Sequence, residues 1–538
     1  MRTGTVLLLI LAALEAQAAL VAENPFPAPE PSEFERSLIG GSVFVKRIRV
    51  EGATSLSAER VADVVRPYEN RRLGAVEIRE IQQHLTRLYV DNGYVTSGVV
   101  VQEGVRGDEL VLKAVEGTVK QVRFTQPPRW SRPQYLTRLL VPDDEEPVHL
   151  GTLQERLAAL RDAGVIDRID AELVPMDKLG ETQLVVSVEE PRPFGARVDY
   201  DNHHSPAVGA RRATIVAWNR NLTGWGDSLD LRYGDTPGLL DALAAYVITI
   251  PYTRLRLGAR YERSDSLAID PPQFRALDIK SHTTTASFEA GYTLLRRASS
   301  ELVAFTTYDR RRGDTTLLGL PFSFITGIDD GVTRITAWRA GLIYSARGES
   351  SVLFARIHAS DGKTNVAEDP PIPGKPASDF RSYFAQAQYA RRIPFLASQA
   401  IGRFETQYTR DVLLPMEKYA LGGSSTVRGY RENLLLRDRA VLGSLEWQVP
   451  LTPSDWKWRA TGALFGDAAW SRNVYDANDT QPRQISSVGT GLIVEGPWGL
   501  SGRIYFAVPN RRWLTPNDDL QDRGIHFALS WEATKLIP

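Results

Sequence analysis

The chain has 538 residues, of which 64 are basic and 65 acidic, so its formal net charge at pH 7 is −1. This balance argues against a nucleic-acid-binding protein, which needs a large basic surface to bind phosphates. The chain has no cysteine. That absence excludes disulfide scaffolds, thiolate metal sites and cysteine nucleophiles, and it suits a protein that crosses an oxidising periplasm. The length predicts about three or four domains.

The first 18 residues have the pattern of a secretory signal peptide. Arg2 supplies a short positive region, Val6–Leu14 is continuously apolar, and Ala16-Gln17-Ala18 is a small-residue cleavage site. The apolar run is too short to cross a hydrocarbon core about 30 Å thick as a helix. Residues 1–18 are therefore predicted to be cleaved on export rather than to form a buried first helix. No other window approaches the roughly 18 apolar residues of a membrane-spanning helix, so we expect an exported protein that is either soluble or a transmembrane β-barrel.

Residues 19–42 are predicted to be a linker. Every second residue from Pro25 to Pro31 is proline, and proline disfavours both a helix interior and a sheet ladder.

Residues 43–190 carry an internal repeat with an offset of 74 residues. The alternating segment 45–50 recurs at 119–124, and each copy is followed by helical spacing of apolar residues and then by two further strand-like segments. The order in both copies is strand, helix, helix, strand, strand, with periodicity changing from 2 to 3.6 and back. This repeat predicts two α+β domains, at residues 43–116 and 117–190.

A small sheet that is covered by helices on one face leaves an edge strand open, so it can bind an extended chain by strand addition. We expect this partner-binding edge in the second repeat. The residues expected to take part are Val119, Val122, Phe124, Leu153 and Leu157.

From residue 191 to residue 538, segments of about ten residues alternate between apolar and polar side chains and are separated by turn residues. Sixteen such segments start near Gly195, Ala210, Asp227, Leu240, Arg254, His282, Ser300, Thr333, Ser351, Asp379, Gln399, Asp438, Lys457, Ser486, Leu500 and Gly524. The even number and the aromatic residues at the ends of the apolar face are typical of an outer-membrane barrel with a polar, wet lumen. A soluble β-sandwich also alternates, but the uninterrupted run, the signal peptide and the lack of a second apolar face favour the barrel.

One irregular stretch stands out between the eleventh and twelfth segments. It spans residues 421–433, is rich in glycine, and carries Arg428 between small or flexible neighbours. Two segments later, Phe465 and Asp467 share one strand face with Thr461 and Ala463, which we expect to face the lumen. An Arg428–Asp467 pair in the lumen would be directional and partly shielded from water.

These residues resemble the motifs of the two-partner secretion outer-membrane transporters of the haemolysin-activator type, within the POTRA-barrel superfamily. The segment 88–97 is similar to the first POTRA domain of this family, and residues 201–202 and 221–227 are similar to its first barrel hairpins. The hallmark loop motif and its partner strand are represented by Val427-Arg428-Gly429-Tyr430 and by Phe465-Gly466-Asp467.

The resemblance implies a transmembrane β-barrel of 16 antiparallel strands, preceded by two periplasmic α+β POTRA domains, in the outer membrane of a Gram-negative bacterium. It implies that the POTRA domains capture a large unfolded exoprotein and that the barrel passes it to the cell surface. Val427, Arg428, Gly429, Tyr430, Phe465 and Asp467 would hold the loop inside the barrel. The other implied partners are outer-membrane lipid, lipopolysaccharide and the barrel assembly machinery. No cofactor, metal or enzymatic activity is expected.

Two features depart from the family pattern. Residues 19–42 are few for a helix that plugs the pore together with its linker, and Trp531 ends the alternation with seven residues still to follow, where the superfamily usually ends in Phe. An assembly factor that inserts other barrels is the alternative function, and a passive porin is a third. Two repeats rather than a longer series favour the transporter, and a porin needs neither the repeats nor the loop.

Overall fold

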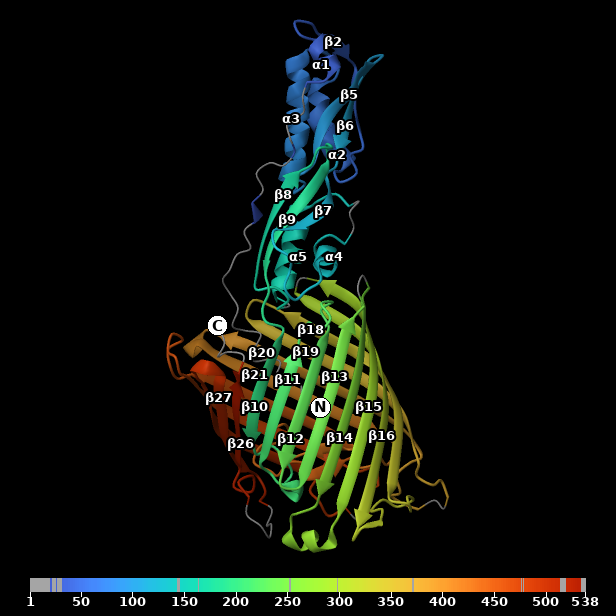
Figure 1. Cartoon of the computed structure of the whole chain (residues 1–538), viewed down its shortest axis with the longest axis vertical. Helices are drawn as coiled ribbons and strands as arrows, with labels where there is room; N and C mark the ends of the chain where they lie inside the picture. The colour runs from blue at the N-terminus through green and yellow to red at the C-terminus, as the bar shows by residue number, and fades with distance from the viewer. Residues whose placement is uncertain are drawn as a thin grey trace. The chain divides into compact units, whose positions relative to one another are not determined.

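The computed structural model describes residues 20–21, 26, 31–142, 146–162, 164–250, 253–297, 299–369, 372–475, 477, 479–512 and 519–533. The predicted signal peptide, most of the proline-rich part of the linker and the last five residues lie outside them. The chain divides into two compact units between Arg192 and Pro193 (Figure 1). None of the helices among the described residues combines the length and the apolar character that a membrane-crossing helix needs.

The N-terminal unit begins with the short strand β1 (Leu20–Val21) and the helix α1 (Glu33–Ser37), whose start is capped by Ser32 and Glu35. The first α+β domain follows, with a three-stranded sheet in the order β3-β6-β5 and a two-stranded sheet of β2 and β4. Its elements are β2 (Val43–Val45), β3 (Arg47–Glu51), α2 (Ala58–Val65), β4 (Arg71–Leu73), α3 (Ala75–Asp91), β5 (Gly98–Arg106) and β6 (Glu109–Val115).

The second α+β domain repeats this order without counterparts of β2 and β4 among the described residues. Its elements are β7 (Thr118–Phe124), α4 (Pro133–Leu140), α5 (Leu150–Asp162), β8 (Arg168–Pro175) and β9 (Glu181–Glu189). The sheet order is β1-β8-β9-β7, with β7 at one margin and β1 parallel to β8 at the other. The predicted sequence of strand, helix, helix, strand, strand is therefore confirmed in the second copy, while the first copy has the additional short strands β2 and β4.

Each of these domains has its own apolar core, as expected for helices that cover one sheet face. In the first domain the helix α3 contributes Ile78, Ile81 and Leu85, each at most 1% exposed. In the second domain the corresponding cluster includes Leu136 and Leu157.

The C-terminal unit is a closed antiparallel barrel of sixteen strands within the described residues, with the two-residue strand β17 (Leu320–Pro321) beside β16 (Figure 1). Its strands are β10 (Phe194–Asp201), β11 (Arg212–Asn219), β12 (Ser228–Thr236), β13 (Leu239–Thr249), β14 (Leu255–Leu267), β15 (Lys280–Arg297), β16 (Ser300–Leu317), β18 (Val332–Arg347), β19 (Ser351–Thr364), β20 (Asp379–Ile393), β21 (Ser398–Thr409), β24 (Arg439–Pro450), β25 (Arg459–Arg472), β26 (Gln484–Glu495), β27 (Leu500–Pro509) and β28 (Ile525–Glu532).

Every one of these strands begins within two residues of its predicted start, but several are longer than predicted, and β15 and β16 are the longest. The strands β15 and β16 have 18 residues each instead of about ten. In β16 the extra length includes Arg310–Arg312. Because both faces of this run are polar, it gives no apolar alternation from which the sequence could predict a strand.

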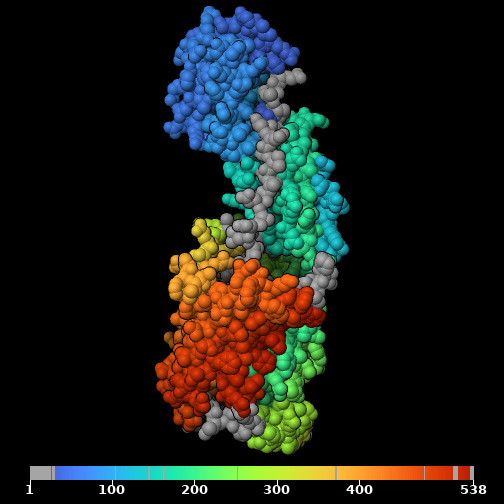
Figure 2. All heavy atoms as spheres, turned by 90° about the vertical axis from the view of Figure 1, so that its left-hand side faces the viewer, coloured from blue at the N-terminus to red at the C-terminus, as the bar shows by residue number. Residues whose placement is uncertain are grey.

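The barrel closes where β10 pairs with β28, with Val198 opposite Trp531. Figure 2 shows the first barrel strands (green) beside the last ones (red). Large apolar side chains such as Leu445 and Val488, 71% and 63% exposed, lie on the outer face, as a lipid-facing wall requires.

The lumen is not uniformly wet, in contrast to the prediction. The chain between β21 and β24 forms a small sheet of β22 (Tyr419–Leu421) and β23 (Leu435–Arg437). Leu421, Val427 and Tyr430 from this segment pack with Leu442 and Ile485 of the barrel strands in one buried apolar cluster. The difference arises because strand alternation describes the wall but not a loop that folds into it.

Candidate functional site

The candidate site is built around residues 410–438, called the inner loop here, which connect β21 to β24. Its tip is tightly turned: Gly423 has a φ of 102°, and a Cβ atom there would lie 2.1 Å from Cδ of Glu432. The backbone nitrogen and Oγ of Ser424 both donate to Oε1 of Glu432, each at 2.7 Å. Glycine is needed at this position because only glycine adopts such a φ freely and leaves room for the carboxylate.

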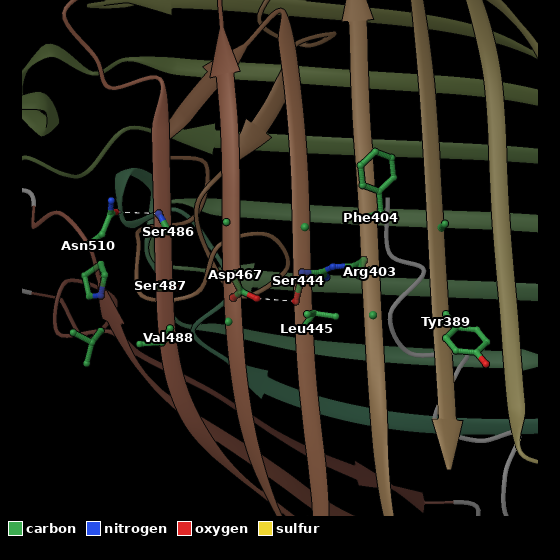
Figure 3. Close-up of a pocket in the computed structure, with 17 residues that line it drawn as sticks. Tyr389, Arg403, Phe404, Ser444, Leu445, Asp467, Ser486, Ser487, Val488 and Asn510 are labelled. Carbon is green, nitrogen blue, oxygen red and sulfur yellow. Dashed lines mark hydrogen bonds between the residues drawn. The ribbon is translucent and has the colours of Figure 1, made fainter. Parts of the chain in front are cut away.

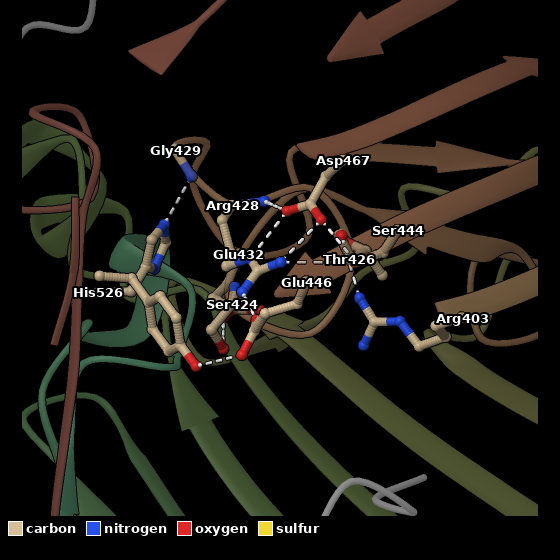
Figure 4. A network of polar contacts seen from close by, with 11 residues as sticks. Arg403, Ser424, Thr426, Arg428, Gly429, Glu432, Ser444, Glu446, Asp467 and His526 are labelled. Carbon is tan, nitrogen blue, oxygen red and sulfur yellow. Dashed lines mark hydrogen bonds and ion pairs between the residues drawn. The ribbon is translucent and has the colours of Figure 1, made fainter. Parts of the chain in front are cut away.

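Arg428 makes the central contact of the inner loop. Its Nε donates to Oδ2 of Asp467 at 2.8 Å and its Nη2 to Oδ1 at 2.9 Å, while its backbone nitrogen also donates to Oδ2 at 3.1 Å (Figure 4). Arg428 is 5% exposed and Asp467 2%. This is the fork-shaped, charge-assisted pairing for which arginine is suited, and it joins the two residues that the sequence placed on the lumen side.

Two aromatic rings and a second carboxylate complete the surroundings of Arg428. The guanidinium carbon lies 3.5 Å from the ring centre of Phe465 and 4.9 Å from that of Tyr505. Arg428 also pairs with Glu446 of β24, which accepts a hydrogen bond from the Tyr505 hydroxyl at 3.2 Å. One cation therefore faces two buried carboxylates, an arrangement that is strongly destabilised if the cation is removed.

The residues beside Arg428 are also held by the barrel. The backbone nitrogen of Gly429 donates to Nε2 of His526 at 2.9 Å, and a Cβ on Gly429, whose φ is 90°, would approach that of Ala507 to 2.9 Å. The hydroxyl of Tyr430 donates to Oδ1 of Asn510 at 2.6 Å. Val427 is fully buried in the apolar cluster. The four predicted residues of the inner loop are thus brought together with the two predicted residues of β25, Phe465 and Asp467.

Several residues of this network were missed from the sequence. Glu446 shares the inward face of β24 with Ser444, so the alternation of that strand could have identified it. Arg431 pairs with Asp522 at 2.7 Å and with Asp270 at 2.9 Å. No sequence signal identifies these partners, because Asp270 and Asp522 lie in separate connections between strands.

The wall behind the Arg428–Asp467 pair carries a hollow of about 910 Å³ on its membrane-facing side. Tyr389, Phe404, Leu445 and Val488 line it, and on the inner side the Ser444 hydroxyl donates to Asp467 at 2.7 Å (Figure 3). Only the single layer of the strand backbone therefore separates the buried ion pair from the lipid-facing surface.

The structure corrects the predicted set of partner-binding side chains in the second α+β domain. Val119, Leu153 and Leu157 are buried in its core, at 4%, 4% and 1% exposure, and Val122 and Phe124 pack against the same cluster. Their spacing marks the core face of the strand and of the helix, so Val119, Leu153 and Leu157 are not available to a partner. The backbone edge of β7 does lie at the margin of its sheet.

The described residues contain no cluster of three or more histidine or acidic side chains that could hold a metal ion. The chemistry of the inner loop is that of hydrogen bonds and ion pairs.

Comparison with known proteins identifies the family. The model of the haemolysin secretion/activation protein family ShlB/FhaC/HecB matches residues 180–494, which is more than half of the chain. The chain belongs to this family. The ShlB-type POTRA domain model matches residues 43–117. The protein is therefore an outer-membrane transporter of two-partner secretion with periplasmic POTRA domains, and transporters of this family work with large exoproteins.

Individual members of the family are distant in sequence. The outer membrane transporter CdiB of Dickeya dadantii is 21% identical over 506 residues, covering 90% of this chain and 87% of that protein. The heme/hemopexin transporter protein HuxB of Haemophilus influenzae is 22% identical, covering 72% and 69% of the two chains. The solved structure of CdiB from Escherichia coli superposes with a TM-score of 0.65 over 94% of this chain and 92% of that one, at 18% identity. At that identity the structural likeness shows the shared fold.

Proposed function

We propose that this transporter captures one large unfolded exoprotein in the periplasm through its POTRA domains and passes it through the barrel lumen to the cell surface. The observation that carries the proposal is the inner loop, which is held inside a closed barrel by the buried Arg428–Asp467 pair. Because the pair is polar, water or a passing chain can take the place of either partner when the loop moves. In this proposal the protein acts as a transporter and not as an enzyme.

The proposal divides the mature chain into a linker at 19–42, POTRA domains at 43–116 and 117–190, and the barrel from 191 to 538. Outer-membrane lipid and lipopolysaccharide would contact the outer wall, where apolar side chains are exposed. The barrel assembly machinery would insert the protein.

We place the capture of the exoprotein at the outer edge of β7, beyond its first residue Thr118, which forms a bridge with Pro147, by strand addition. In three other strands of the N-terminal unit, backbone groups at the sheet margin already have a partner. The backbone nitrogen of Ile48 in β3 donates to Glu69 at 3.0 Å, that of Val99 in β5 donates to Thr86 at 3.1 Å, and β8 pairs with β1. On β7, polar side chains such as Gln121 and Arg123 are exposed on one face while the other face packs on the core. An added strand would therefore extend the sheet without disturbing the core.

The seam of the barrel supports a transporter over an assembly factor, the alternative function. A factor that templates other barrels has to offer them an open strand edge. Here Asn202 and Gln521, both fully buried, bind across the seam. Asn202 donates to the carbonyl of Ile525 at 2.9 Å and accepts from the backbone nitrogen of Phe527 at 2.8 Å, and Gln521 donates to the carbonyl of Asn202 at 2.6 Å.

A paired proteome of the culture supernatant and the outer membrane, with and without the gene for this protein, tests the proposal. We expect one large secreted protein to disappear from the supernatant while the outer-membrane barrels remain at their normal levels. Depletion of many barrels at once would instead establish an assembly factor.

A further inference from the structure

The inner loop is tied to the barrel at a second place, far along the loop from Arg428. Glu417 lies in the segment that enters the lumen from β21, and its side chain is 6% exposed. Nη2 of Arg339 on β18 donates to both oxygens of Glu417, at 3.0 and 2.9 Å. Nη1 of Arg311 on β16 donates to the carbonyl of Met416 at 2.7 Å. Two neighbouring wall strands thus bind adjacent loop residues.

The cationic half of this contact is fixed by the wall itself. Nε of Arg339 donates to Asp309 of β16 at 2.6 Å, and its Nη1 donates to Ser360 of β19 at 2.8 Å. The side chain of Arg339 is only 13% exposed. Arg339 therefore keeps its place through bonds within the wall, and Glu417 is the part of the contact that can leave with the loop.

The two ties lie on different parts of the wall. Arg428 is bound by β24 and β25, while Glu417 is bound by β18, and the strands β19, β20 and β21 lie between them in the barrel order. Breaking the Arg428–Asp467 pair alone would leave the entering segment of the loop attached to the wall. The loop is therefore held to the wall on both sides of β19, β20 and β21.

We propose that Glu417 and Arg339 form a second anchor of the inner loop, so that the resting pore stays narrow only while both anchors are made. This inference rests on the proposed function, because it concerns the same pore and names a further residue that controls it. Glu417 is a positioning residue: it acts by holding the loop across the lumen.

The test is the resting conductance of the purified full-length protein in planar lipid bilayers, measured without any exoprotein. Glu417→Gln keeps the size of the side chain and removes its charge, and we expect a severalfold higher resting conductance than in the wild type. The combination with Asp467→Asn should open the pore further than either change alone. Asp361→Asn is the matched control: it breaks the exposed Arg381–Asp361 pair on the neighbouring strands, at 2.9 Å and with side chains 76% and 64% exposed, and it should leave the conductance unchanged.

Folding of each variant is checked by the heat-dependent shift of the barrel on a semi-native gel. If Glu417→Gln does not fold, the double change Arg339→Gln with Asp309→Asn provides a second variant. It removes the bonds from Arg339 to Glu417, leaves Glu417 only its 3.4 Å contact with Arg311, and leaves no unpaired carboxylate on the wall. Wild-type conductance in a folded variant would overturn the second anchor. Failure of both variants to fold would also overturn it, since the contact would then serve folding rather than closure. Because no exoprotein is present, this result is independent of whether the proteome experiment finds a secreted partner.

Discussion

In the two POTRA domains the buried cores are apolar, whereas in the barrel the inner loop combines an apolar cluster with buried charged pairs that bind it to the wall. The first domain packs Ile78, Ile81 and Leu85 of α3 against its sheet. Around the inner loop, by contrast, Arg428 faces two carboxylates and Arg339 binds Glu417. Apolar burial is non-directional, and its stabilisation is lost as a whole when a core opens. A buried ion pair instead fixes one geometry, and each charged group can bind water once the pair is exposed. The comparison indicates a permanent fold in the periplasm and a releasable element in the barrel.

The largest loss of stability is expected from removing a carboxylate that pairs with Arg428. In Asp467→Ala, Arg428 keeps only Glu446 as a charged partner in a buried site. Breaking a buried pair in this way costs about 3–5 kcal/mol, so the barrel should unfold at a lower urea concentration, as followed by the gel shift. Asp361→Ala removes an exposed partner instead and should cost about 0–1 kcal/mol. Equal effects of the two changes would contradict the distinction between buried and exposed pairs.

Truncation of a core side chain in the first POTRA domain should lower the free energy of unfolding of that domain nearly as much. Leu85→Ala deletes a side chain that is 1% exposed, and such core truncations cost about 2–5 kcal/mol. Urea unfolding of the periplasmic unit, residues 19–192, measures this loss. Val76→Ala on the same helix is the control, because Val76 is 79% exposed and a surface change of this kind stays within about 0.5 kcal/mol.

A smaller loss of barrel stability is expected from a change at Tyr430. Tyr430→Phe keeps the ring in the apolar cluster but removes the hydroxyl that binds Asn510 at 2.6 Å and the carbonyl of Ser486 at 3.1 Å. The loss should be about 0.5–1.5 kcal/mol in the same gel-shift assay. If Tyr430→Phe destabilised the barrel as much as Asp467→Ala, hydrogen bonds rather than the buried charge would hold the loop.

The smallest effect is a pH dependence in the periplasmic unit. Burial raises the pKa of Glu116, but hydrogen bonds from Thr54, Ser55 and the Tyr89 hydroxyl outweigh it and leave this pKa below its usual value. The contribution of Glu116 to folding stability is then complete above the pKa of about 4.3 that a glutamate has in the unfolded chain. It is lost as the pH falls through the pKa of Glu116 in the folded protein. Thermal unfolding at decreasing pH should show this loss in the wild type. The variant Glu116→Gln should show a weaker acid dependence, and an unchanged acid dependence would exclude Glu116 as its source.

Most of the fold could be predicted from the sequence because each wall strand alternates and each turn interrupts the alternation. The limits are physical. The polar extension of β16 shows no alternation between apolar and polar residues. The apolar spacing at Leu153 and Leu157 marks a core face rather than a binding face.

The site could be predicted only where a strand fixed the direction of a side chain. Phe465 and Asp467 share a face of β25, so an arginine in the lumen has an evident partner. The contact between Glu417 and Arg339 depends on the path of a loop across the lumen, and Arg431 reaches Asp270 and Asp522 through two other connections. Such contacts are set by tertiary structure and leave no local pattern in the sequence from which they could be predicted.

The most direct test of the central claim is the amount of exoprotein that the variant Arg428→Ala delivers to the culture supernatant, compared with wild type at equal levels of folded barrel. The account predicts a strong loss of secretion, because the loop is no longer held in its working position. It also predicts little recovery in Arg428→Lys, which keeps the charge but cannot form the two-pronged bond to Asp467. Secretion at the wild-type level from Arg428→Ala would contradict the claim that this pair holds the loop for transport.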